Sequence, residues 1–129
     1  MGKTTLLEGN AMSEGIPAVT VLMGVFNGLP HLAGAIESIL AQSFADFEFL
    51  IIDDASTDGS VDVIAEYARR DARVRVILNQ ENQGLGAVLN RGVQEARGTL
   101  VARMDADDRS VPHRLERQVA FLESHPDVD

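Results

Sequence analysis

Residues 47–54 read FEFLIIDD, an apolar run of strand length that ends in two carboxylates, Asp53 and Asp54. The run is rich in aromatic and β-branched residues, which indicates a buried strand over 47–52. Apolar residues then recur at helical spacing through residues 61–68, which predicts a helix directly after the acidic turn. This stretch is therefore one unit of strand, polar turn and helix.

The same unit is repeated on both sides of this stretch. We predict further strands at 19–26, 74–78 and 100–104, and further helices at 32–42, at 85–96 and after Ser110 as N-cap. Short connections between alternating strands and helices favour right-handed crossovers and a parallel sheet. The predicted fold class is α/β: a Rossmann-like open, mainly parallel sheet of about four strands in the order 3-2-1-4, with helices on both faces. The fourth strand would be an edge strand, which predicts self-association of the chain.

The first 17 residues, MGKTTLLEGNAMSEGIP, do not share this pattern. They mix Gly, Ser, Thr and Glu without a sustained period. We expect residues 1–17 to form a flexible leader and residues 18–129 to form the domain. GKTT at residues 2–5 matches the tail of a phosphate-binding loop, but no strand precedes it and the first glycine of that motif is absent.

Composition limits the classes of function. A chain of 129 residues with 45% hydrophobic content suits one globular domain. Acidic residues outnumber basic ones 20 to 11, and the net charge of −9 argues against a nucleic-acid partner. The chain has no cysteine and no apolar run of membrane-spanning length, so we expect no disulfide and no membrane span. These features predict a cytoplasmic protein, with the inner face of the membrane as a second location for a full-length form.

Polar residues follow each predicted strand: Asn27, the pair Asp53 and Asp54, Asn79, and Asp105. Each alone is commonly a helix cap or a turn residue. Together they would lie at the carboxyl ends of parallel strands, where α/β sheets bind ligands. Carboxylates that converge there need a cation or hydrogen-bond donors. The sequence therefore predicts a binding crevice at this edge of the sheet.

The fourth predicted strand runs into DADD, residues 105–108. In an extended backbone the first and third residues face the same side, so Asp105 and Asp107 can face one ligand together. Mg²⁺ and Mn²⁺ take oxygen ligands and leave positions for substrate phosphates. Asp-x-Asp is common in acidic loops, but its place directly after a buried strand favours a site for Mg²⁺ or Mn²⁺.

Four ordered stretches carry a resemblance to a known family. They are VTVLMGVFNG (19–28), SILAQSFADFEFLIIDDASTDGS (38–60), NQENQGLGAVLNRGV (79–93) and GTLVARMDADDRSVPHRLERQ (98–118). Over about residues 18–127 the chain resembles the nucleotide-sugar-binding half of a family 2 glycosyltransferase with the GT-A fold. The resemblance implies a truncated GT-A domain.

The resemblance also implies roles for the matching residues that bind nucleotide. Asp53 and Asp54 would lie by the base and ribose, and the backbone at Phe26 and Asn27 would help to hold the base. Asp105 would lie near the ribose and diphosphate.

Asp107 would be the metal ligand, and Asp108 would lie beside the metal or cap the next helix. The family's glycine-rich motif, whose glycines allow close approach to a ligand or a neighbouring strand, is matched by Asn82, Gly84, Asn90 and Gly92. Arg91 is a candidate for phosphate binding, with a solvated helix face as the alternative.

The family implies the reaction. We expect metal-assisted transfer of a sugar, with inversion, from a nucleotide-diphosphate sugar donor to a hydroxyl of a carbohydrate or lipid-linked acceptor, in cell-envelope polysaccharide synthesis. The family places its catalytic base further along the chain than Asp129. The catalytic residue is therefore unknown, and we expect this fragment to be inactive alone.

Three other classes share parts of this pattern. A nucleotide-sugar binding module without transfer activity would have the same donor site. A sugar nucleotidyltransferase needs a basic glycine-rich loop after its first strand, and FNGLPHLAG at 26–34 lacks one. A signalling receiver domain needs its acidic pair after the first strand and a late lysine, whereas the only lysine here is Lys3.

Overall fold

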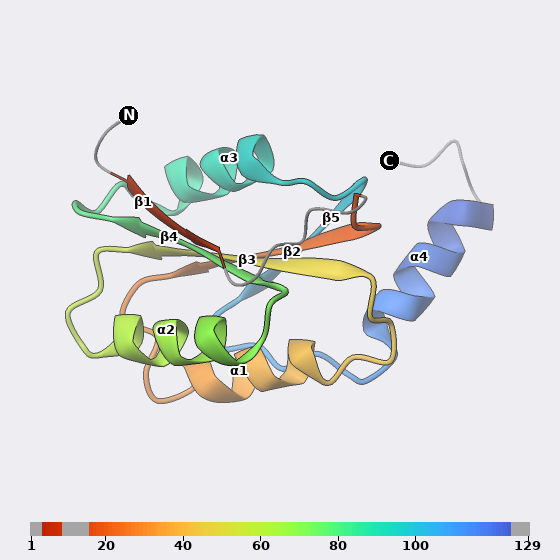
Figure 1. Ribbon diagram of the computed structural model, residues 1–129, viewed down its shortest axis with the longest axis horizontal. Coiled ribbons are helices and arrows are strands. Elements are labelled where there is room, and N and C mark those ends of the chain that lie inside the picture. Colours follow the sequence, from red (N-terminus) through yellow and green to blue (C-terminus); the bar gives the residue numbers. More distant parts are fainter. Residues whose placement is uncertain (1–3, 9–15, 125–129) are drawn as a thin grey trace.

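The computed structural model describes residues 4–8 and 16–124, in which strands and helices alternate along the chain (Figure 1). The strands are β1 (Thr4–Glu8), β2 (Val19–Val25), β3 (Phe47–Asp54), β4 (Val74–Asn79) and β5 (Leu100–Asp105). The helices are α1 (Leu32–Leu40), α2 (Ser60–Arg70), α3 (Leu85–Glu95) and α4 (Arg114–Ser124). None of the helices in this described part of the chain has the length and apolar composition of a membrane span.

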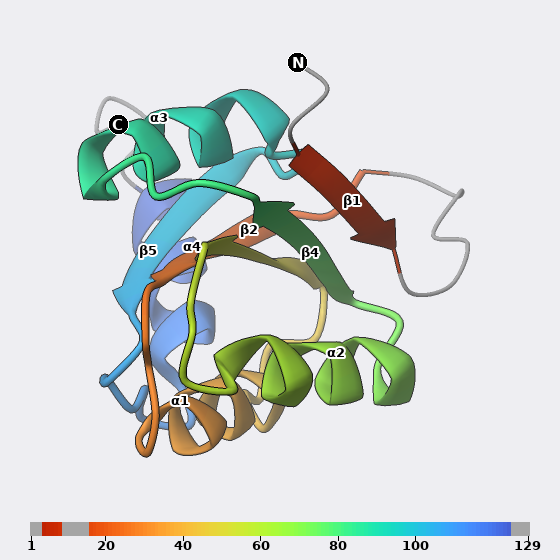
Figure 2. The same ribbon diagram turned by 90° about the vertical axis from the view of Figure 1, so that its left-hand side faces the viewer.

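The strands form one sheet in the order β1-β4-β3-β2-β5. β2 pairs in parallel with both β3 and β5, and β3 pairs in parallel with β4. The predicted order 3-2-1-4 of the four parallel strands is thus confirmed, with β5 at one edge. α3 covers one face of the sheet, α1 and α2 cover the other, and α4 lies on the side of β5 (Figures 1 and 2).

The sheet has one strand more than the sequence pattern predicts. β1 pairs antiparallel with β4, and its five residues lie opposite residues 75–79. The expectation of a flexible leader over residues 1–17 is therefore wrong for these five residues. TTLLE is too short to show a strand period, and β4 would otherwise present a row of unpaired backbone groups that an antiparallel strand satisfies.

Two strands continue further into the acidic motifs than we predicted. β3 includes Asp53 and Asp54, and β5 includes Asp105, because their backbones still pair with neighbouring strands. The last helix begins at Arg114, so the predicted N-cap, Ser110, lies four residues ahead of it. The backbones of Asp53, Asp54 and Asp105 are therefore fixed by strand pairing rather than by a turn.

Alternation along the strands builds a core on each face. The larger core packs the sheet against α1 and α2, and its fully buried members include Val21, Met23, Ile36, Phe49 and Ile51. The smaller core packs Leu22, Leu50, Ile52 and Ile77 against Val88 of α3. Gly92 makes this packing close, because a Cβ built on it would lie 2.3 Å from Leu22 Cδ1. α3 therefore lies directly on the sheet, which fixes the position of the loop that precedes it.

The α3 face becomes polar at the amino ends of the parallel strands. Glu48 and Arg75 form a buried ion pair, with 2.8 Å between Glu48 Oε1 and Arg75 Nη1. Glu48 Oε2 accepts hydrogen bonds from Thr20 Oγ1 at 2.5 Å and from the Arg97 amide at 2.6 Å. Burial alone would raise the pKa of Glu48, but these hydrogen bonds and the Arg75 charge outweigh it and hold the pKa below its ordinary value. The network ties β2, β3 and β4 together at the end of the sheet opposite the acidic motifs.

Candidate functional site

Asp53 lies at the carboxyl end of β3 with 1% of its surface exposed. Its Oδ2 accepts a hydrogen bond from the Ser56 amide at 3.0 Å. Its Oδ1 is buried and has no hydrogen-bond partner in the part of the chain that the structure describes. A buried acceptor without a donor is costly in a folded protein. This oxygen is therefore an unsatisfied acceptor at the carboxyl end of β3, and it is closed off from the surface in this conformation.

Asp54 is also buried, but protein donors occupy its carboxylate. Oδ1 accepts from Asn79 Nδ2 at 3.0 Å and from the Gln83 amide at 2.8 Å. Oδ2 accepts from the Gly84 amide at 2.9 Å, and Asn82 Nδ2 donates to the Asp54 carbonyl at 3.2 Å. Asp54 thus holds the loop between β4 and α3. Its predicted contact with a base or ribose stays a prediction.

The loop after β2 is fastened to the loop after β3. Asn27 has a left-handed backbone with φ 52°, and its Oδ1 accepts from the Thr57 amide at 2.8 Å. The Asn27 amide donates to Ser56 Oγ at 2.8 Å. Phe26, the preceding residue, is 55% exposed. An aromatic side chain is thus held at the surface by a fixed loop at the same edge as Asp53.

Asp58 and Ser60 complete this fastening, and the sequence reasoning gave them no role. Ser60 Oγ accepts from the Gly28 amide at 2.9 Å, and Asp58 Oδ2 accepts from the Leu29 amide at 3.2 Å. The Ser60 hydroxyl donates to Asp58 Oδ1 at 2.6 Å, which holds the pKa of Asp58 below its ordinary value. In the sequence, these contacts are indicated by the spacing of the polar motif DD-x-S-x-D-G-S. The periodicity of the hydrophobic residues does not indicate them.

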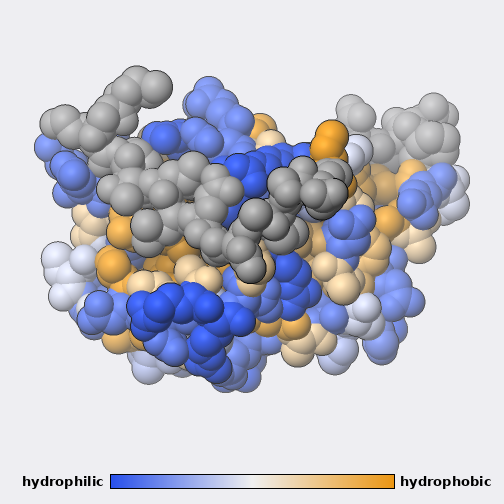
Figure 3. Space-filling model, in the orientation of Figure 1, coloured by the Kyte–Doolittle hydropathy of each residue, from blue (hydrophilic) through white to orange (hydrophobic). Residues whose placement is uncertain are grey.

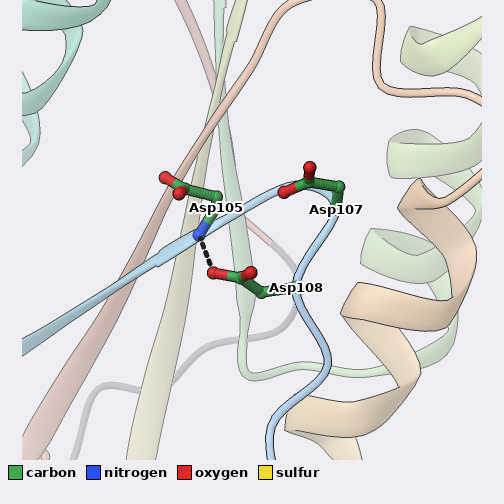
Figure 4. A group of neighbouring side chains, drawn as sticks. All are labelled: Asp105, Asp107 and Asp108. Atoms are coloured by element: carbon green, nitrogen blue, oxygen red, sulfur yellow. Dashed lines mark hydrogen bonds between the residues drawn. The ribbon is translucent and has the colours of Figure 1, made fainter.

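The acidic cluster, which we define as Asp105, Asp107 and Asp108, follows β5. All three side chains are exposed, and each offers a carboxylate oxygen within 4.8 Å of the others (Figure 4). The turn is closed by two hydrogen bonds: the Asp108 amide donates to the Asp105 carbonyl at 3.1 Å, and the Asp105 amide donates to Asp108 Oδ2 at 3.2 Å. Carboxylate oxygens gathered in this way are hard ligands that fit Mg²⁺ or Mn²⁺.

The acidic cluster and Asp53 lie on either side of β2. Gly24 of β2 pairs with Asp105, and the next residue, Val25, pairs with Asp53. Neighbouring strands are about 4.8 Å apart, so the backbones of the two acids lie about 10 Å apart. Side chains alternate along a strand, so Asp53 points to the side of α1 and α2, as Val25 does, whereas Asp105 points to the side of α3, as Gly24 does. A ligand that met both would have to reach across the carboxyl end of β2.

Other predicted residues lie along α3 and contact the protein. Arg91 Nε pairs with Glu95 Oε2 at 3.1 Å, one turn further along the helix. This is the contact expected of a solvated helix face, and phosphate binding by Arg91 stays a prediction. Gly92 approaches Leu22 of the neighbouring strand, which was one of its two expected roles. Asn90 is exposed.

Comparison with known proteins agrees with this fold and these motifs. Residues 20–129 match the family model described as "Glycosyl transferase family 2". A relative from Bacillus subtilis (strain 168), named "Putative glycosyltransferase EpsE", is 47% identical over 110 residues, which are 84% of this chain and 40% of the relative.

Two solved structures are similar to the chain. The S. aureus TarS 1-349 structure in complex with UDP-GlcNAc has a TM-score of 0.77 and 26% identity, over 83% of this chain and 31% of that chain. The mannosyltransferase PcManGT from Pyrobaculum calidifontis, in complex with GDP-Man and Mn²⁺, has a TM-score of 0.74 and 28% identity, over 84% of this chain and 33% of that chain. The chain spans less than half the length of each of these proteins. The predicted GT-A fold is thereby confirmed, and the chain belongs to glycosyl transferase family 2.

Proposed function

We propose that this chain is the donor-binding half of an inverting glycosyltransferase. It binds a nucleotide-diphosphate sugar together with Mg²⁺ or Mn²⁺ and presents the sugar for transfer to an acceptor hydroxyl. One observation carries the proposal: Asp53, whose buried Oδ1 has no hydrogen-bond partner among the described residues, and the exposed acidic cluster lie at the ends of the two strands that flank β2. A nucleotide sugar has the matching chemistry, since its base carries N–H donors and its diphosphate attracts a divalent cation.

The nucleoside end is assigned to Asp53, Phe26 and Asn27. Asp53 Oδ1 would accept a hydrogen bond from a ring N–H of the base. Uracil, guanine and thymine all carry such a group, so this contact alone does not select among them. The exposed ring of Phe26 offers an apolar surface beside it, on a loop that Asn27 fastens. The UDP-GlcNAc and GDP-Man in the two similar structures support a nucleotide sugar as the ligand.

The diphosphate end is assigned to the acidic cluster. Asp107 would hold the cation, with Asp105 and Asp108 beside it. A chain with a net charge of −9 offers a diphosphate little other compensation. The cation, when bound, supplies Lewis-acid stabilisation of the diphosphate leaving group. The Mn²⁺ in the PcManGT complex supports this assignment.

Transfer also needs a general base for the acceptor hydroxyl. We assign that role to no residue of this chain, and we propose that the base and the acceptor site belong to a region outside these 129 residues. The acceptor is proposed to be a carbohydrate or a lipid-linked carbohydrate of the cell envelope. We also propose that transfer inverts the anomeric centre in a single displacement, as the family resemblance implies.

Calorimetry with UDP tests the proposed donor site. We expect UDP to bind in the presence of Mn²⁺ and to bind about tenfold more weakly after chelation, a difference of about 1.4 kcal/mol. Equal affinity with and without chelator would contradict the role of the acidic cluster. Absence of binding in both conditions would contradict the donor site as a whole.

A second candidate is a nucleotide-sugar binding module that performs no transfer. The share of the relatives that the chain spans, 31–40%, favours this reading for the isolated chain. Both candidates predict the same binding of UDP. They differ in whether a sugar reaches an added acceptor, which a transfer assay measures.

A further inference from the structure

We propose that Gln42 is the positioning residue for the acidic cluster, because it holds the loop between β5 and α4 against the end of α1. The inference rests on the function proposed above for that cluster. Gln42 lies two residues after α1 and is only 6% exposed, although glutamine is usually found at the surface. A buried amide side chain needs partners for its donors and its acceptor.

The Gln42 side chain has one partner in the loop, one in α4 and one in α1. Its Nε2 donates to the Val111 carbonyl at 2.7 Å and to the Ser38 carbonyl at 3.1 Å. Its Oε1 accepts from the Leu115 amide at 3.0 Å. Leu115 is the second residue of α4, and an amide in the first turn of a helix has no acceptor within that helix. Gln42 therefore binds both the loop and the start of α4, across 69 and 73 residues of sequence.

Other contacts of α1 hold the same loop. The Ser110 amide donates to Ser38 Oγ at 2.9 Å. The Arg109 side chain lies against Gly34, since a Cβ built on Gly34 would lie 2.4 Å from Arg109 Nη2. A larger residue at position 34 would push this side chain away. One side of α1, at Gly34, Ser38 and the following Gln42, thus forms the seat of the loop.

The acidic cluster lies between two fixed points. Asp105 is held by its strand pairing with Gly24, and the hydrogen bonds with α1 begin at Ser110. Residues 106–109 are all that separate these points, so a shift of the loop at Gln42 moves Asp107 and Asp108. Three neighbouring carboxylates repel one another, and a cation is held well only where the backbone keeps them together. Loss of the Gln42 contacts spreads the cluster and weakens cation binding, while Asp53 on β3 is unaffected.

The test compares Gln42→Met with the matched control Thr20→Val. Gln42→Met keeps the length of the side chain and removes its hydrogen bonds. Thr20→Val removes buried hydrogen bonds with Glu48 and Gly98 in the polar network, away from the loop. In calorimetry we expect Gln42→Met to weaken Mn²⁺-dependent binding of UDP by about tenfold or more, the range known for supporting contacts of metal ligands. Binding of uridine, which has no phosphate, should be the same in all three proteins.

The outcomes separate this inference from the proposed function. If Gln42→Met lowers the thermal midpoint but keeps the parent's Mn²⁺-dependent affinity, the residue is merely structural and the inference fails. If it weakens uridine and UDP equally, the inference also fails, because the effect is not confined to the cation. If the parent chain itself binds UDP equally with and without Mn²⁺, the proposed function fails and this inference fails with it. Should Gln42→Met not fold, Gln42→Glu keeps the acceptor for Leu115, loses the donor to Val111, and carries the same expectation.

Discussion

Asp54 and Gly84 are joined by a hydrogen bond of 2.9 Å from the Gly84 amide to Asp54 Oδ2, across 30 residues of sequence. Gly84, the N-cap of α3, has φ 91° and ψ 155°, a backbone conformation that residues with a Cβ rarely adopt. The carboxylate thus fixes a loop of unusual conformation at the ligand edge. We therefore expect Asp54 to support nucleoside binding indirectly, by holding this loop in place.

Replacement of Asp54 by Ala should lower both stability and nucleoside affinity. Three donors lose their acceptor, so we expect the free energy of unfolding to fall by about 3 kcal/mol. The dependence of UDP binding on Mn²⁺ should remain, because the acidic cluster follows a different strand. Urea denaturation and calorimetry measure the two effects. The surface over α2 is hydrophilic (Figure 3), and Asp62 is an exposed residue of that helix. Asp62→Ala is the control, and equal stability of the two variants would contradict the prediction.

Replacement of Asp107 by Ala should remove the dependence of UDP binding on Mn²⁺. The affinity in Mn²⁺ should fall about tenfold, toward the value measured in chelator. Asp46→Ala removes the same charge from an exposed position next to the start of β3 and should keep the parent's response to Mn²⁺. A similar loss in both variants would mean that overall charge, rather than a cation site, governs the binding.

Acid should destabilise the chain through Glu48. The pKa of Glu48 is lower in the folded than in the unfolded chain. Ionised Glu48 therefore contributes fully to the free energy of unfolding above the ordinary glutamate pKa, and this contribution is lost as the pH falls through the pKa of Glu48 in the folded chain. Glu48→Gln removes the charge that pairs with buried Arg75 at 2.8 Å and leaves Arg75 the longer ion pair with Glu95 at 3.9 Å, so we expect the free energy of unfolding at neutral pH to fall by about 3 kcal/mol. The variant should then lose less stability than the parent in acid. Parallel curves of unfolding free energy against pH would refute this.

The isolated chain should transfer no sugar to an added acceptor. General-base assistance is worth about 10² to 10⁴ in rate, and we assign no such base here. A radiolabelled or mass-spectrometric transfer assay with purified chain measures this. Acceptor-dependent turnover would overturn the prediction, whereas slow hydrolysis of the donor would not, because water needs no acceptor site.

The chain should self-associate through β5. Within the described residues one edge of this strand is unpaired, Val101 is 42% exposed, and an apolar groove lies between β5 and α4. Val101→Lys should weaken the association, because a charge at a strand edge opposes pairing with another chain. Val93→Lys, at an exposed position of α3, should behave as the parent does. Light scattering over a dilution series measures the association of the parent chain and both variants. A parent chain that stays monomeric at its highest soluble concentration would exclude this interface.

The parallel part of the sheet could be predicted because each strand is an apolar run followed by an amphipathic helix, and crossover handedness leaves few strand orders. The acids at the strand ends could be predicted as well, because each directly follows a predicted strand and the carboxyl ends of parallel strands lie at the same edge of the sheet. β1 could not be predicted, since its pairing with β4 depends on an edge more than 60 residues away rather than on a pattern within TTLLE.

The contacts that support the site could not be predicted either. Asp54 binds Gly84 across 30 residues, and Gln42 binds Val111 across 69. Both depend on which loops the finished sheet brings together. Local spacing identifies residues that can ligate, but the residues that hold them in place become visible only in three dimensions.

The extra strand also bears on how far assembly can proceed. β1 covers the outer side of β4, so in the part of the chain that the structure describes, the sheet has its open parallel-strand edge at β5 alone. Two chains joined edge to edge through β5 would each use the same surface, and a pairing of that kind is closed by twofold symmetry. The outer side of β1 is the other edge of the sheet, a strand of five residues, so growth beyond two copies would have to use β1. The size of the assembly would thus depend on which edge pairs: β5 with β5 gives a closed dimer, whereas a contact between β5 and β1 leaves both outer edges free for further copies.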